Sequence, residues 1–519
     1  MGLVEFYDII KFLGCGFLVY SILDAINTRY ALNKHASHPL VGGPSTLMPK
    51  WLLNIGYAWR STELARVGYE KYRDKAFQLM RSNGPVVVLP VHLLDEVARI
   101  PHNVAESTAA LEQDLLGQFT GVDLILESRL HHSIVQRKLT PRLTTLLPQM
   151  EEAATAAFDE YFPQSTEWTE FMPYQALAKA SARLSAGVIV GPEFADNEEW
   201  LHVAIDYTEN LFRTVVILRM FPSWMHPLLA RLHPSYWAGK RLLEQGKRLL
   251  GPKLQTLLDL NDAGKWQPDD TKPEDLNVLS WLAALAKGRE RTAETIGHVL
   301  VLVALATVHT TLLRMVNVLY DVLSTNPELQ DELLAEIAEV AKKGWHDNAN
   351  GNPYDDLHKL DSVLRESQRM SPPTTMGMKR LFKQDYTFAD GTHVRAGTYA
   401  CMPVFAVEND PAVTPNPEKF DGLRAYRERF ASAEEKTEYL FSSPGPQFLN
   451  FGYGKTACPG RFFASVVVKM VTVKALTEYE FKFKDAKGRP QNLMFHEFLF
   501  TWPWTKMLVR KKEKGQCPF

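Results

Sequence analysis

The sequence has 519 residues, of which 45% are hydrophobic and 23% charged, and its formal net charge is −2. This composition is typical of a folded globular chain, and the near-neutral charge excludes the large cationic surplus that nucleic-acid binding requires. The chain has only four cysteines, which excludes a disulfide framework, and no CxxC pair suggests a zinc site.

We expect the first segment of the chain to anchor it to a membrane. Residues 12–23 form an uncharged apolar run, which is shorter than the roughly 20 residues that a spanning helix needs. The leading residues are acidic and no small-residue cleavage site is evident, so a cleaved signal peptide fits poorly. We therefore expect residues 1–28 to be an uncleaved anchor, with a merely buried helix as the alternative. Residues 29–50 are predicted to be a proline-rich hinge, and residues 51–519 to be one folded domain.

The body of the chain is predicted to be mainly helical, with small β-sheets. The longest expected helix covers residues 293–324 and is apolar nearly all round, which is typical of a helix in the centre of a large protein. Strand patterns gather late in the chain. We expect one hairpin around Asp390 and Gly391, and another over residues 496–510.

Glu366 and Arg369 lie one helical turn apart on a single predicted face. They could be a solvated surface pair. However, Pro372 and Pro373 end the helix directly afterwards, and a further arginine, Arg424, follows in the segment PEKFDGLR. A buried carboxylate that holds two guanidinium groups needs such a set, because an unpaired buried charge is costly.

The segment NFGYGKTACPGRFFASVVVKM carries the chemistry. A nucleotide-binding loop fits poorly, since no strand precedes the glycines and the third glycine is missing. A haem-thiolate loop explains each position. Gly452 lets the loop lie flat against a porphyrin, Phe451 supplies an apolar wall, and Pro459 suits the first turn of a helix. Cys458 would then lie at a helix N-terminus, where a thiolate is favoured, and an iron-bound thiolate promotes O–O cleavage.

These motifs resemble, in order and spacing, the three signatures of the cytochrome P-450 family. In addition, ATVHTT in the long helix resembles the distal oxygen-binding motif of that family. Within the family the chain looks most like fungal microsomal members that oxidise terpenoids or meroterpenoids, of the ent-kaurene oxidase type. That narrower resemblance is carried by ATVHTT, SPPTTMGMKR and GKTACPGRFFAS.

The resemblance implies a single haem-binding catalytic domain on an N-terminal anchor, at the endoplasmic reticulum membrane and facing the cytosol. It implies haem b, NADPH electrons delivered by a membrane-bound reductase, O2, and a hydrophobic small-molecule substrate. The expected activity is NADPH-dependent hydroxylation or oxidation. The alternatives are a haem-thiolate isomerase or dehydratase without a reductase, which Thr310 disfavours, and a non-catalytic haem-binding protein.

The same resemblance assigns a role to each of the residues that match the family motifs. The expected axial ligand of the iron is Cys458. The expected loop residues around the sulfur are Phe451, Gly452 and Gly460. The expected structural set is Glu366, Arg369 and Arg424. The residues expected to face oxygen are Ala306, His309 and Thr310. The residues expected to meet the haem propionates are Arg137, together with His132, and one of Lys379 and Arg380.

The chain departs from the family pattern at three places. Thr456 stands where a propionate-binding Arg or His is usual, so Lys455 or another cation would have to substitute. The tryptophan usually found near Arg137 is missing. His309 replaces the usual acid before Thr310, and two interpretations stay open: a proton relay, or a buried structural histidine.

Overall fold

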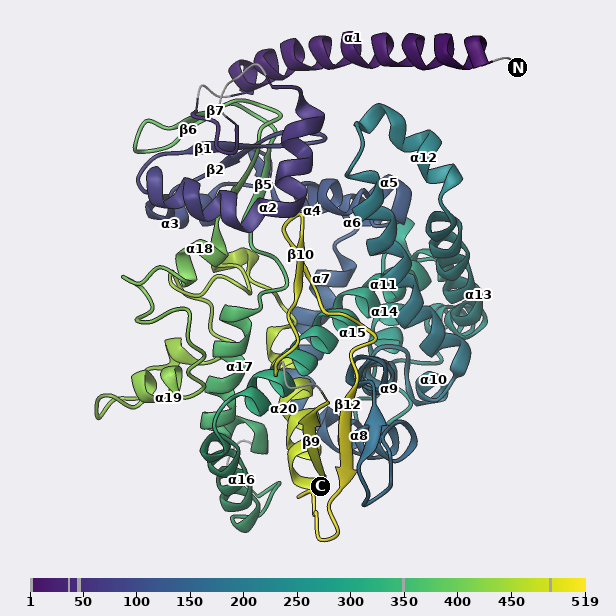
Figure 1. The fold of residues 1–519 in the computed structure, drawn as a ribbon. Helices are drawn as coiled ribbons and strands as arrows, with labels where there is room; N and C mark the ends of the chain where they lie inside the picture. Colours follow the sequence, from purple (N-terminus) through teal and green to yellow (C-terminus); the bar gives the residue numbers. More distant parts are fainter. Residues whose placement is uncertain (1–2, 36–37, 44–47, 348–350, 485–487) are drawn as a thin grey trace.

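The computed structural model describes residues 3–35, 38–43, 48–347, 351–484 and 488–519, and helices dominate it (Figure 1). The α-helices are α1 (Leu3–His35), α2 (Lys50–Lys71), α3 (Leu94–Arg99), α4 (Ser107–Leu115), α5 (Gly117–Thr120), α6 (Leu124–Glu127), α7 (Leu130–Ile134), α8 (Leu143–Tyr161), α9 (Pro173–Val190), α10 (Pro192–Ala195), α11 (Glu198–Leu218), α12 (His226–Leu232), α13 (Pro234–Asp262), α14 (Val278–Leu285), α15 (Ala293–Ser324), α16 (Pro327–Lys342), α17 (His358–Met370), α18 (Val404–Glu408), α19 (Arg424–Arg429) and α20 (Arg461–Glu478). The strands are β1 (Phe77–Arg81), β2 (Gly84–Val88), β3 (Ala105–Glu106), β4 (Thr169–Phe171), β5 (Gly377–Phe382), β6 (Tyr386–Thr387), β7 (His393–Val394), β8 (Tyr399–Met402), β9 (Tyr479–Phe483), β10 (Leu493–Phe495), β11 (Phe498–Phe500) and β12 (Met507–Lys511).

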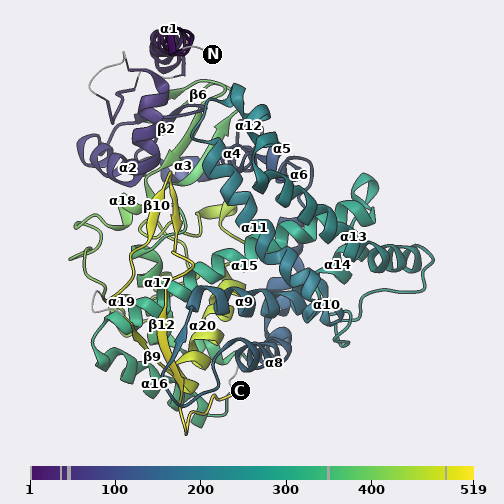
Figure 2. The same ribbon diagram turned by 45° about the vertical axis from the view of Figure 1, so that its right-hand side comes forward.

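Helix α15 runs through the middle of the molecule, as its sequence predicts (Figures 1 and 2). It packs against α9, α11, α13, α17 and α20, which explains why an apolar surface surrounds it on nearly all sides. Thr292 caps its first turn by accepting a hydrogen bond from the Thr295 amide. The bounds of α15 match the predicted ones.

The strands form a five-stranded sheet in the order β1-β2-β8-β5-β3 and smaller sheets beside the helical body. The hairpin expected around Asp390 and Gly391 is confirmed as the antiparallel pair β6–β7. The second expected hairpin is wrong, because β11 pairs with β10 whereas β12 pairs with β9 and β4. Pro503 lies between β11 and β12 and has no N–H for a ladder. Strand β9, which continues directly from α20, offers β12 a five-residue partner.

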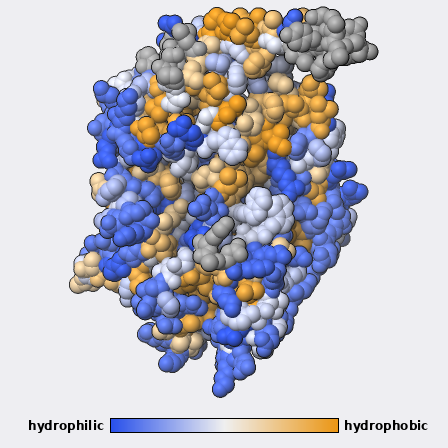
Figure 3. Space-filling view, in the orientation of Figure 1, coloured by the Kyte–Doolittle hydropathy of each residue, from blue (hydrophilic) through white to orange (hydrophobic). Residues whose placement is uncertain are grey.

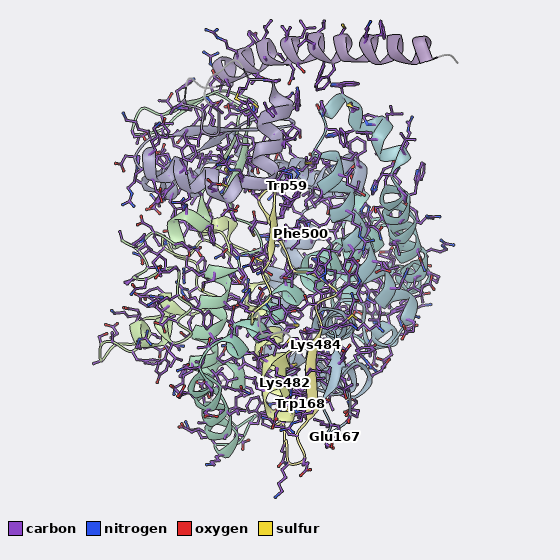
Figure 4. The ribbon with its side chains drawn as sticks, in the orientation of Figure 1. Trp59, Glu167, Trp168, Lys482, Lys484 and Phe500 are labelled. Carbon is purple, nitrogen blue, oxygen red and sulfur yellow. The ribbon has the colours of Figure 1, made fainter. Side chains whose placement is uncertain are left out.

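The hairpin β10–β11 reaches from α2 towards the centre of the molecule. At its head the ring of Phe495 meets Trp59 edge-on, with centroids 4.8 Å apart. Phe500 lies further along the same hairpin, nearer α15 (Figure 4). The hairpin therefore joins the sheet-rich part of the molecule to the helical part.

Helix α1 extends beyond the body, with its second half docked on α2 (Figures 1 and 2). Asp24 accepts a hydrogen bond from the Trp51 amide, and the Trp51 indole donates to Ser21. Apolar side chains gather on this side of the molecule (Figure 3). Those that are exposed include Phe12, Leu18 and Leu23 of α1, Trp59 of α2, Trp224, and Leu228 and Leu232 of α12. Within the described residues, the helix that is long and apolar enough to cross a membrane is α15, which is largely buried in the protein.

Candidate active site

The loop before α20 presents the Cys458 sulfur to the interior. The Cys458 amide donates to the carbonyl of Phe451 at 2.7 Å, which closes the loop on itself. Gly452 has φ +76°, which residues other than glycine disfavour, and a Cβ there would lie 3.1 Å from the Thr456 carbonyl oxygen. Any side chain at this position would therefore strain the backbone and crowd that carbonyl. Phe451 packs edge-on against Phe441, with centroids 5.1 Å apart. The loop is therefore a rigid support for one sulfur atom.

Cys458 is accessible even though protein surrounds it closely, as expected for a side chain that faces an internal cavity. Burial raises the pKa of the thiol, while the backbone N–H groups of Gly460 and Arg461 and the Arg461 charge act to lower it. The helix N-terminus therefore favours the thiolate, as the sequence indicates, but burial outweighs it in the free thiol. A bound metal cation would reverse that balance, because a coordinating thiol loses its proton.

One stretch of α15 is open where the rest of the helix is buried. Ala306 and Thr310, one turn apart, are exposed, whereas the neighbouring Val308 and Thr311 are each 2% exposed. The Thr310 hydroxyl donates to the Ala306 carbonyl at 2.7 Å. That bond occupies the hydroxyl proton and leaves the oxygen lone pairs free to accept from a guest in the cavity.

His309 does not share this open face. Its ring is buried between Phe212 of α11, stacked at 5.8 Å, and Tyr174 of α9, edge-on at 6.2 Å. Burial lowers the pKa of His309 to about 4, so the ring is neutral at neutral pH. Of the two interpretations, the structure favours packing over a proton relay.

Glu366 and its two arginines meet in one buried cluster. Arg369 binds Glu366 with two hydrogen bonds of 2.7 and 3.0 Å, and Arg424 donates to the same carboxylate at 3.3 Å. Glu366 and Arg369 are 3% and 5% exposed. Arg369 also donates to the Pro417 carbonyl and Arg424 to the Pro415 carbonyl. The surface-pair alternative is thereby excluded, and the cluster holds the segment before the cysteine loop against α17.

Of the two candidate cations on β5, only Arg380 lies at the cysteine loop. Its guanidinium donates to the Thr456 hydroxyl at 3.0 Å, at the position where the sequence lacks a basic side chain. Burial lowers the pKa of Arg380 to about 10. The groups that accept its hydrogen bonds, the Thr456 hydroxyl and the Lys379 carbonyl, carry no negative charge. Arg380 is thus a buried cation suited to a carboxylate guest.

Lys379, the other candidate, points into a buried ion cluster instead. Its ammonium lies 2.6 Å from Asp114 and 3.7 Å from Glu497. Arg81 and Arg219 complete the cluster, at 2.7 Å from Asp114 and 2.9 Å from Glu497 respectively. The cluster joins α4, β1, β5, the end of α11 and the turn of the β10–β11 hairpin. The Lys379 ammonium is therefore engaged in ion pairs within the protein and does not lie at the cysteine loop.

Further basic groups gather on the Arg380 side of the loop. Burial lowers the pKa of His132 and of His102, and the nearby charge of Arg129 lowers both further. Arg137 is exposed in a π-helical turn, Val135–Leu139, and this segment is held to the loop because Thr140 donates to the Pro459 carbonyl. Sequence reasoning missed His102 and Arg129, since no motif spacing connects them to the cysteine.

Comparison with known proteins decides the family. The cytochrome P450 family model matches residues 69–509. A cytochrome P450 monooxygenase of Emericella nidulans, AN1598, is 34% identical over 95% of this chain and 91% of its own length. The chain belongs to the cytochrome P450 family. The ent-kaurene oxidase P450-4 of Gibberella fujikuroi is 33% identical over 91% of this chain and 92% of its own. The monooxygenase olcJ of Penicillium canescens is 32% identical over 96% and 93%.

The fold agrees with that assignment. The solved structure of retinoic acid-bound cyanobacterial CYP120A1 matches with a TM-score of 0.64 and 17% identity, over 92% of this chain and 99% of that one. A P450 is a haem-thiolate monooxygenase that uses haem b and receives electrons from NADPH through a reductase. The residues present fit this group: an accessible cysteine on a rigid loop, an open face on α15, and a buried guanidinium that forms no ion pair with any residue that the structure describes.

Proposed function

We propose that this P450 oxidises a hydrophobic terpenoid or meroterpenoid intermediate of secondary metabolism. The observation that carries the proposal is the similarity, over nearly the full length, to relatives that include ent-kaurene oxidases. The residues over α15 support it, because Phe212 meets Phe498 and Phe500 edge-on at 5.7 and 6.0 Å. Such an aromatic wall suits an apolar ring system better than a charged metabolite.

When bound, haem b supplies the oxygen activation and the redox chemistry. The Cys458 sulfur would bind its iron, and Arg380 would meet a propionate beside Thr456. On the open stretch of α15, Thr310 would accept a hydrogen bond from water and so help to hand on a proton, while the small Ala306 leaves space there.

We further propose that the protein lies on the cytosolic side of the endoplasmic reticulum membrane and takes electrons from the NADPH–cytochrome reductase there. The exposed apolar side chains of α1 and of α12 support a membrane contact. This location would also concentrate a lipophilic substrate near the enzyme.

The test is expression of the protein with a fungal reductase in a host that makes terpenoid or meroterpenoid skeletons, followed by untargeted analysis of metabolites. We expect an oxygenated product that requires both the P450 and the reductase. The Cys458→Ala variant is the matched control, and it should lose both the product and the thiolate-ligated carbon monoxide spectrum. Product formation without reductase would favour an isomerase or dehydratase. A full thiolate spectrum in Cys458→Ala would contradict the whole assignment.

A further inference from the structure

Glu408, the last residue of α18, lies beside the residues at which the cysteine loop begins, and it has no part in the family motifs described above. It is 1% exposed. One carboxyl oxygen accepts a hydrogen bond from the Leu449 amide at 2.7 Å, and the other lies 2.6 Å from the amide group of Asn450. Glu408 therefore binds, through its two carboxyl oxygens, the two residues that immediately precede Phe451.

These two residues set the course of the loop. The Leu449 carbonyl accepts from the Gly452 amide at 2.8 Å, and the Phe451 carbonyl accepts from the Cys458 amide at 2.7 Å. A shift of Leu449 or Asn450 would therefore pass through two short hydrogen bonds to the iron ligand. Glu408 has the place of a positioning residue, since it acts on Cys458 through the loop and not by contact.

The charged neighbours of Glu408 are engaged elsewhere. Arg365 and Arg369 of α17 are the cations that face it, but Arg365 donates to the Leu440 and Ser443 carbonyls and Arg369 is bound to Glu366. Helix α2 also packs near α18, and Arg73, which follows the end of α2, pairs with Asp410. Within the described part of the chain, Glu408 forms no ion pair. A buried carboxyl group without a paired cation is held more easily as the neutral acid.

The contact with Asn450 allows the neutral form of Glu408. The Glu408 oxygen lies 2.6 Å from the Asn450 side-chain amide, within the range of about 2.5–3.0 Å that is usual for O–H···O hydrogen bonds. The two ends of an amide have the same shape, and no hydrogen bond on the far side of Asn450 fixes its orientation, because Oδ1 is buried there without a partner.

We propose that Glu408 is a neutral carboxylic acid in the working enzyme, and that in this form it positions the haem loop. Its carbonyl oxygen accepts from the Leu449 amide, and its hydroxyl donates to the Asn450 side-chain oxygen. Burial raises the pKa of Glu408 to about 8, in agreement with this geometry.

The raised pKa fixes the direction of the pH dependence. The folded loop holds the proton up to about pH 8, whereas a solvated glutamate releases it near pH 4.3. The loop is therefore most stable in acid, and it loses this contribution as the pH rises from the solvated value towards the folded one. Above that range the contribution stays constant.

The first test is infrared spectroscopy of the haem-loaded protein at about pH 7, comparing wild type with Glu408→Gln. Glutamine keeps the shape and both hydrogen bonds of the neutral acid, so the variant should fold. We expect wild type to show the C=O stretch of a buried carboxylic acid that Glu408→Gln lacks, and that disappears in wild type as the pH passes about 8. Glu336→Gln is the control, because Glu336 also accepts two backbone amides, at the start of α17 and away from the loop. It should keep the Glu408 band.

The second test measures how much of the reduced carbon monoxide complex keeps thiolate ligation at a fixed temperature below global melting. Wild type and Glu336→Gln should lose thiolate ligation more readily at about pH 8 than at about pH 5, whereas Glu408→Gln should lack this additional loss towards about pH 8. If Glu408→Gln and wild type have the same infrared spectrum at about pH 7, or the same profile of thiolate loss, the proposal is overturned. Neither measurement depends on the identity of the substrate.

Discussion

At the scale of single residues, Thr310 and His309 are neighbours in sequence with different surroundings. The Thr310 hydroxyl lies on the open stretch of α15, and the His309 ring lies in an aromatic sandwich. We expect Thr310→Ala to lower product formed per NADPH consumed by roughly 10-fold or more and to raise hydrogen peroxide, since Thr310 positions the water that delivers the proton, and positioned proton transfer contributes about 10²–10⁴-fold. His309→Phe, which preserves the stacking, should keep near wild-type coupling. Strong uncoupling in His309→Phe would restore the relay interpretation.

The pH dependence of stability gives His309 a second test. Because burial lowers the pKa of His309 to about 4, the folded protein binds this proton less readily than the unfolded chain does. Its stabilising contribution is therefore complete above about pH 6.5 and is lost as the pH falls towards the folded value. We expect the melting temperature of wild type to fall relative to His309→Phe between about pH 7 and pH 5. Parallel curves over that interval would mean that the ring is more solvated than its packing indicates.

At the scale of elements, the Glu366 cluster fixes the segment around Asp421 against α17. Glu366→Ala would leave Arg369 without its carboxylate in a buried site, and breaking such a pair costs about 3–5 kcal/mol. We expect low yield, poor haem retention and a lower melting temperature rather than a selective kinetic defect. Glu63→Ala is the matched control, because Arg60 and Glu63 form an exposed pair at the same helical spacing. A soluble Glu366→Ala protein with wild-type melting would contradict the structural role.

The buried ion cluster at the β10–β11 turn should respond to acid. Ion pairing with Arg219, Lys379 and Arg81 holds the pKa of Glu497 well below its usual range despite burial. This contribution is present above the unfolded value of about 4.3 and is lost as the pH falls below it. We expect Glu497→Ala to be markedly destabilised at about pH 7, with the gap to wild type narrowing towards about pH 3. Chemical unfolding at both pH values measures the gap, and a constant gap would show that lost packing, not charge, dominates.

Local patterns predicted some elements well and long-range contacts poorly. The bounds of α15 follow from periodicity and capping within one segment, and the loop of Cys458 follows from the spacing of glycine, cysteine and proline. The partnership of Asp114 with Lys379 does not, because 265 positions separate them and only the packing of α4 against β5 brings them together. Glu408 is similar, since nothing in its sequence surroundings indicates that the haem loop lies against it. The prediction for β12 was wrong for the same reason, because its partner β9 precedes the β10–β11 hairpin in the sequence.

At the scale of the whole molecule, the apolar side chains on one side predict how the protein is held at a membrane. The first half of α1 extends from the body, whereas Ser21 and Asp24 in its second half bind Trp51. We expect deletion of residues 1–20 to move most of the protein into the soluble fraction with its haem retained.

The remaining membrane affinity should come from the exposed side chains near α12. In the truncated protein, Trp224→Ser with Leu228→Ser should release the fraction that is still bound to membranes. The same two substitutions in the full chain should leave the protein membrane-bound. Fractionation of cell extracts distinguishes these forms. Full-length wild type that is entirely soluble would exclude the anchor.

The four cysteines differ so much in their surroundings that thiol-labelling chemistry could distinguish them. Cys401 is buried, and burial raises the pKa of Cys401 to about 12 and that of Cys517 to about 11, so both are poor nucleophiles at neutral pH. Cys458 would be covered by its metal in the loaded enzyme. Cys15 remains, exposed on the protruding half of α1. A polarity-sensitive fluorophore attached there would report directly how deeply that helix enters a lipid bilayer, without any change to the native sequence.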